Sequence, residues 1–347
     1  MSGGQSPRVA DAGTQARRRL VGLGAALVLL VAVAVASLAV GARDIAPGTV
    51  VRALLDPSLA DRSYDAAVVL DERLPRTLLA LMVGACLGAA GVIMQAVTRN
   101  PLVDGGILGT ELGAAVAVVA AILFLGVSGA SNYFWFALAG AAVTTALVVM
   151  LSRLATDTSE TVSLVISGAA ASALLAALIT IMTVRDTSVF AHYRYWSIGQ
   201  LSGRAGTIDE LWPFAVTGIV LALFLGSTLN ILGLGDDVAT ALGVRVPLAQ
   251  LMVMTVAVLL CAAATSATGP IGFVGLVGAH VARLLVGADN RWTIPYAMLC
   301  GVVLLLAADV LGRLAPGDGE IQVSIMTAVV GTPFFVALAR RRRLVAA

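Results

Sequence analysis

Residues 73–97 read RLPRTLLALMVGACLGAAGVIMQAV and give the clearest indication of the fold class. After Arg76 it contains no charged residue, and Gly84, Gly88 and Gly91 place small side chains three or four positions apart. About 20 apolar residues are enough for a helix to cross a bilayer. Small residues at this spacing let membrane helices approach each other closely. The stretch therefore predicts a transmembrane helix packed against other helices.

The whole chain has a similar composition. Of its 347 residues, 59% are hydrophobic and 12% are charged, whereas about 25% of the residues of a soluble domain are charged. Adding the 36 glycines brings the apolar share to roughly 69%, against about 45–50% for soluble domains. The composition predicts an all-α integral membrane protein with no room for a separate soluble domain.

The composition also excludes several kinds of chemistry. All 22 basic residues are arginine, so the chain has neither the lysine of a Walker A loop nor one for Schiff-base catalysis. Any ATP-driven work must be done by another subunit. The three cysteines lie in apolar runs, and the two histidines are far apart in sequence. The chain is predicted to hold no metal or cofactor of its own.

Apolar runs separated by turn or charge signals predict about ten transmembrane helices. The ends of these runs are good to about four residues. The predicted spans cover residues 20–41, 73–97, 105–127, 132–152, 161–184, 211–231, 247–267, 270–286, 294–312 and 321–339.

Arginines near both ends of the chain predict its orientation. Three precede the first span at 17–19, and four follow the last span at 340–343. Because cytoplasmic segments carry an excess of basic residues, both termini are predicted to be cytoplasmic. Residues 1–19 are predicted to form a flexible tail, 20–343 a single membrane domain and 344–347 a C-terminal tail.

In this orientation Arg73, Arg76 and Arg313 lie at the outer ends of their spans. Arg73 and Arg76 are three residues apart and share one helix face. Guanidinium groups bind carboxylates bidentately, which suits the docking of an acidic partner. Long basic side chains also extend to the membrane surface as simple anchors, and the spacing alone leaves both interpretations open. Asp309 and Arg313, four residues apart, are predicted to pair.

A short cytoplasmic loop, RNPLVD at 99–104, joins two glycine-rich spans. Asparagine and proline break a helix, so the loop predicts a tight polar reversal. Such a reversal could constrict a cytoplasmic exit or be an ordinary turn.

A second cytoplasmic segment, LGDDVATALGVRV at 234–246, predicts a short amphipathic helix. Asp236 and Asp237 would lie in its first turn, where acidic side chains complement the helix dipole, and Gly243 would cap its C-terminus. The helix could receive a push from a soluble partner or lie in the membrane interface.

Two ionisable residues lie within predicted spans without an evident function. Glu111 has no evident local partner, and an intramembrane carboxylate is a functional candidate that could face a cavity. His280 in the eighth span is more often a hydrogen-bonding packing residue than a ligand.

Several of these motifs, in this order, resemble the FecCD family, whose members are permease subunits of bacterial ABC importers for iron-siderophores, haem and cobalamin. The resemblance covers about residues 66–343, and within the family it is greatest to the ferric-enterobactin subgroup. The motifs are RLPRT (73–77), MQ (94–95), RNPL (99–102), ATALGVRV (239–246), GPIGFVGL (269–276), VGADNRW (286–292), the stretch from Ala308-Asp309 to Arg313, and Val323-Ser324.

The resemblance implies a type II ABC importer permease fold of ten helices in the bacterial cytoplasmic membrane. It implies a second FecCD-type permease, a paralogue in this subgroup, as the partner in the membrane. It also implies two copies of an ABC ATPase that bind ATP and Mg²⁺, and a substrate-binding protein outside. Nucleic acid is not an expected partner, and this subunit is not expected to be an enzyme.

The resemblance also implies roles for individual residues. Arg73, Arg76 and Arg313 match arginines that meet acidic residues of the binding protein. Asn100, Leu102 and Thr161 match the cytoplasmic gate. The candidates for ATPase coupling, within about 232–246, are Asp236, Asp237, Ala241, Leu242, Gly243 and Arg245, and those for the translocation path are Gln95 and Glu111. The chain departs from the family at Ala279, where proline is usual.

Other functions stay open. A haem or cobalamin importer of the same family is the nearest alternative to a siderophore importer. An ion-coupled secondary transporter would need carboxylates inside its spans and inverted repeats, and only Glu111 and Asp309 qualify. An intramembrane enzyme would need a nucleophile–base pair or a metal site, and two distant histidines argue against it.

Overall fold

The computed structural model describes residues 9–41, 43–154, 160–184, 186–315 and 319–340, and these are nearly all helical. Within them, seven helices are long and apolar enough to cross a membrane, and three others are apolar but shorter. The ten helices follow the ten predicted spans in order, which confirms the all-α membrane fold. They are α1 (Val9–Ala39), α4 (Leu74–Val97), α5 (Thr110–Leu125), α6 (Ala130–Leu154), α7 (Glu160–Val184), α9 (Ile208–Leu232), α11 (Val246–Thr268), α12 (Val274–Val286), α13 (Asn290–Leu314) and α14 (Val323–Arg340).

The predicted span at 270–286 forms a helix only from Val274 onward. Gly269 and Phe273 both have positive φ angles, +78° and +69°, and this backbone cannot continue a helix. At about 1.5 Å per residue, the 13 residues of α12 reach roughly 20 Å, which is less than a hydrocarbon core of about 30 Å. The helix therefore starts inside the protein, where Asp104 accepts a hydrogen bond from the backbone N–H of Phe273.

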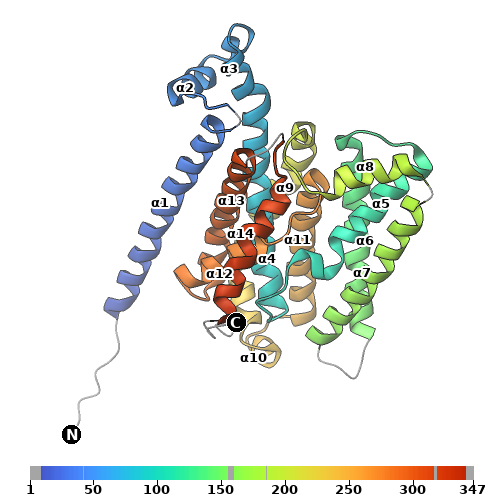
Figure 1. The fold of residues 1–347 in the computed structure, drawn as a ribbon. Coiled ribbons are helices and arrows are strands. Elements are labelled where there is room, and N and C mark those ends of the chain that lie inside the picture. The colour runs from blue at the N-terminus through green and yellow to red at the C-terminus, as the bar shows by residue number, and fades with distance from the viewer. Residues whose placement is uncertain (1–8, 42, 155–159, 185, 316–318, 341–347) are drawn as a thin grey trace.

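Helix α4 lies at the centre of the bundle, against α9, α11, α12 and α13 (Figure 1). In the most apolar 18-residue stretch of this helix, 83% of the residues are buried. The corresponding shares are only 6% in α1 and 11% in α7. A Cβ atom added to Gly88 would lie 2.2 Å from the carbonyl oxygen of Ala297, and one on Gly91 would lie 2.3 Å from that of Gly275. The predicted small-residue packing is therefore confirmed, because backbone meets backbone at these positions.

Short helices cover the two ends of the bundle (Figure 1). One end carries α2 (Pro47–Leu55), α3 (Tyr64–Ala67) and α8 (Thr187–Ser197), and the opposite end carries α10 (Asp236–Ala241) with the C-terminal turns of α14. Within the predicted N-terminal tail of residues 1–19, residues 9–19 are helical. Helix α1 begins at Val9, and Arg19 already donates a hydrogen bond to the carbonyl oxygen of Val286, the last residue of α12.

Candidate functional site

The outer end of the bundle holds a buried cluster of arginines and carboxylates. Asp309, 1% exposed, lies 2.7 and 2.9 Å from two guanidinium nitrogens of Arg76 and forms an ion pair with Arg313 at 3.2 Å. Arg76 also pairs with Glu320 at 2.6 Å. The predicted Asp309–Arg313 pair is confirmed. The sequence did not predict that Arg76 and Glu320 belong to this cluster, because they are 233 and 11 residues away from Asp309 in the chain.

The other guanidinium contacts at this end hold α1 against the bundle. Arg73, 7% exposed, donates to the carbonyl oxygens of Leu38 and Arg43. Arg313 donates to those of Ser37 and Val40 at 2.9 and 3.0 Å. The expected open group of three guanidinium groups is therefore largely engaged within the chain.

These arginines still border open space. Arg73, Arg76 and Arg313 line a cavity of about 470 Å³, which Asp71, Glu72 and Glu320 also line. A carboxylate from a partner would meet both the arginines and the carboxylates of this lining, so the docking role stays a prediction.

At the opposite end, the loop after α4 makes the predicted reversal. Arg99 has a φ of +48°, and the side chain of Asn100 accepts a hydrogen bond from the backbone N–H of Leu102 at 3.0 Å. This bond fixes the turn and leaves Leu102 48% exposed. Thr161 lies in the first turn of α7, but its side chain is outside the described part. The gate itself stays a prediction.

The predicted amphipathic helix is present as α10, one and a half turns long. Gly243 follows it with a φ of +84°, as expected for a residue that ends a helix. Ala239 is buried, whereas Leu234, Val238 and Leu242 are 61%, 45% and 60% exposed. The helix therefore turns its larger apolar side chains away from the bundle. The remaining coupling candidates, Asp236, Asp237, Ala241 and Arg245, are also exposed.

One side chain connects this helix to the loop after α4. Arg99 pairs with Asp236 at 2.7 Å and donates to the carbonyl oxygen of Leu232 at 3.1 Å. The two residues are 137 positions apart, so spacing gave no signal for the contact. The predicted gate loop and the predicted coupling helix are joined directly.

The two candidates for the translocation path lie in different surroundings. Gln95 is fully buried within this chain and accepts a hydrogen bond from Arg283, and its role on a path stays a prediction. Glu111 is half-buried in the first turn of α5, with its carboxylate beside Gly106. Its role on a path stays a prediction. Among the described residues, no group of His, Cys, Asp and Glu could hold a metal ion.

Comparison with known proteins connects these features to a family. The FecCD transport family matches residues 29–341. The ferric enterobactin transport system permease protein FepD of Escherichia coli is 39% identical over 95% of this chain and 98% of its own length. The hemin transport system permease protein HmuU of Yersinia pestis is 35% identical over 92% of this chain and 96% of its own.

A solved structure has the same fold over nearly the same length. It is described as a metal-chelate type ABC transporter in an inward-facing conformation. Its TM-score to this chain is 0.77 at 31% identity, and the match covers 92% of this chain and 98% of that one. With the family match and the 39% identical relative, it makes the protein a member of the FecCD transport family, a permease of ABC importers in the bacterial cytoplasmic membrane.

Proposed function

We propose that the protein carries a ferric siderophore of the catecholate type, similar to ferric enterobactin, into the cell. The observation that carries this proposal is the 39% identity with E. coli FepD over 95% of the chain. Hemin is a second candidate, beside ferric citrate and ferric hydroxamates, because relatives named for these three substrates are 35–37% identical to the chain.

The proposed transporter contains a second FecCD-type permease, a paralogue of this chain, and two ABC ATPase subunits that bind ATP and Mg²⁺. The exposed apolar side chains at α10 support a contact with the ATPase, because Leu234 before the helix, Val238 within it and Leu242 after it are all exposed. Exposed apolar groups in such a cluster are typical of an interaction surface.

Movement of the ATPase subunits would then reach the gate loop through Arg99. Closure of the ATPase dimer on ATP displaces α10, and the Arg99–Asp236 ion pair transmits this displacement to the turn that presents Leu102. The pair is about half exposed on both sides, so it can break and re-form as the loop moves.

At the outer end, the cavity bordered by Arg73, Arg76 and Arg313 supports the docking of an acidic substrate-binding protein. A carboxylate from that protein would compete with Glu320, which is 41% exposed, for Arg76. Docking would in this way loosen the contact between α4 and the segment that leads into α14.

Uptake of radiolabelled iron in iron-starved cells tests the substrate. Cells without the gene should lose uptake of iron presented as a catecholate complex, and the intact gene should restore it. Hydroxamate-bound iron and haem serve as parallel substrates. Loss of haem uptake alone would support hemin as the substrate. Vanadate should stop transport and an uncoupler should not, and the reverse result would indicate an ion-coupled transporter.

Copurification tests the coupling helix. Leu242→Asp places a charge among the exposed apolar side chains of α10 and should prevent recovery of the ATPase with the permease. The matched control is Thr240→Asp, at an exposed position of the same helix. Recovery of the ATPase with both variants would place the contact elsewhere.

A further inference from the structure

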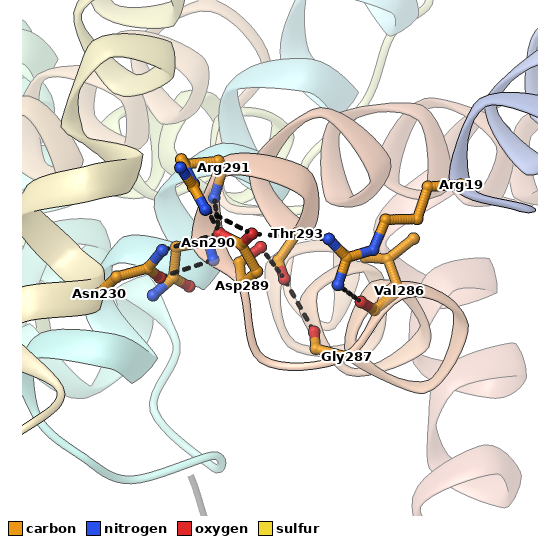
Figure 2. A network of polar contacts seen from close by, with 8 residues as sticks. All are labelled: Arg19, Asn230, Val286, Gly287, Asp289, Asn290, Arg291 and Thr293. Atoms are coloured by element: carbon orange, nitrogen blue, oxygen red, sulfur yellow. Dashed lines mark hydrogen bonds and ion pairs between the residues drawn. The ribbon is translucent and has the colours of Figure 1, made fainter. Parts of the chain in front are cut away.

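The end of the bundle that carries α10 holds a polar network between α1 and α13 (Figure 2). Asp289 immediately precedes α13. Its carboxylate accepts two hydrogen bonds from Arg291 at 3.1 Å each and one from the side-chain amide of Asn230 at 2.7 Å, and it forms an ion pair with Arg19 at 3.6 Å. Arg19 reaches across from α1 and also donates to the carbonyl oxygen of Val286. The carboxylate is therefore fully engaged by neighbouring donors.

A cavity of about 420 Å³ opens beside this network, and its lining combines charged and apolar groups. Arg19, Asp289 and Arg291 line one part, and Leu23, Trp292 and Pro295 line the rest. The guanidinium of Arg19 lies 5.8 Å from the ring centre of Trp292. Such a lining suits a ligand with an anionic head and an apolar remainder.

The charge around the cavity is strongly positive. Arg17 and Arg18 are exposed and immediately precede Arg19 on α1, and the side chain of Arg291 is 63% exposed. Arg19 and Arg291 therefore line the cavity beside one carboxylate, Asp289, which they already neutralise, and two more arginines lie one and two residues before Arg19 in the chain. The buried Nε–H of Arg19 has no acceptor within the described residues, so this guanidinium retains an unused donor.

We propose that this cavity binds the phosphate headgroup of an anionic glycerophospholipid from the cytoplasmic leaflet. The position of the cavity beside the exposed face of α1 favours a lipid over a free anion. Helix α1 is almost unburied along its apolar length, so acyl chains have access to its side of the cavity. Leu20 and Val21, 58% and 65% exposed, continue that apolar surface beside Arg19. Basic pockets between helices on the cytoplasmic side bind such headgroups, and tryptophan is enriched at this depth.

Native mass spectrometry of the full-length protein in detergent tests the site. Phosphatidylglycerol and phosphatidylcholine are added in equal amounts, and the bound lipid is counted. Phosphatidylglycerol should be retained preferentially. Each arginine removed in Arg18→Gln and Arg291→Gln should lower its affinity about fivefold. The matched control is Arg52→Gln with Arg62→Gln, two exposed arginines of the opposite end.

Because Arg291 also holds Asp289, Arg17→Gln with Arg18→Gln serves as a second variant that leaves the network intact. Equal retention of the two lipids, or a preference that survives both sets of substitutions, would overturn the proposal. Binding of glycerol 3-phosphate as tight as that of phosphatidylglycerol would also overturn it, since it would assign the site to a soluble phosphate.

Discussion

Two arginine–carboxylate pairs at opposite ends of the bundle are buried to very different degrees. At the outer end the side chains of Asp309 and Arg313 are 1% and 4% exposed, whereas at the inner end those of Arg99 and Asp236 are 48% and 49% exposed. Removing one partner of a buried pair leaves an uncompensated charge, while an exposed pair contributes little to stability. The outer cluster therefore fixes the structure, and the inner pair can exchange as the protein works.

Asp309→Ala should have the largest effect on this comparison. It leaves the guanidinium groups of Arg76 and Arg313 without their shared carboxylate, and the free energy of unfolding should fall by about 3–5 kcal/mol. Unfolding in detergent micelles, followed by tryptophan fluorescence, measures the loss. Asp71→Ala, an exposed carboxylate of the same end, is the control. Equal losses in the two variants would mean that burial does not distinguish them.

Glu320→Ala should have an intermediate effect. Glu320 pairs with the same Arg76 but is 41% exposed, so its removal should cost about 1 kcal/mol of unfolding free energy. The same unfolding measurement compares it with Asp309→Ala. A loss as large as that of Asp309→Ala would show that the cluster acts as one unit.

Asp236→Ala should change unfolding free energy by no more than about 0.5 kcal/mol but lower iron uptake roughly two- to tenfold. The reason is that Arg99 loses its contact to α10 while the turn around Asn100 persists. Asp61→Ala, an exposed carboxylate of the opposite end that belongs to none of the proposed sites, is the control. Normal uptake by Asp236→Ala would remove this pair from the coupling route.

The loss of the Asp289 carboxylate, tested as a function of pH, should have the smallest effect on stability. Hydrogen bonds from Arg291, followed by that from Asn230, lower the pKa of Asp289 from its usual 3.8 to about 2. A lowered carboxyl pKa contributes stability above the usual pKa, and the contribution is lost as the pH falls from about 4 to 2. The unfolding temperature of Asp289→Asn should therefore lie about 2 °C below wild type at pH 5–7. The difference should close below pH 3, and one that is constant from pH 7 to 2 would contradict it.

The sequence predicted local features well because they follow from composition and spacing. The ten apolar segments, the glycine spacing of α4 and the Asp309–Arg313 pair depend on residues close together in the chain. The contacts of Arg99 with Asp236 and of Arg283 with Gln95 join residues 137 and 188 positions apart, and no pattern within a segment indicates them. The late start of α12 was missed because an apolar run does not reveal where the backbone breaks.

The attachment of α1 has a consequence for biosynthesis. Arg19 bonds to Val286, 267 residues later, and at about 5–20 residues per second the ribosome needs on the order of 15 to 50 seconds to make that stretch. Helix α1 must reside in the bilayer for that time without its contacts to α12 and α13. A helix with only 6% of its apolar window buried loses little by waiting, because lipid already surrounds the side chains that the finished protein leaves exposed.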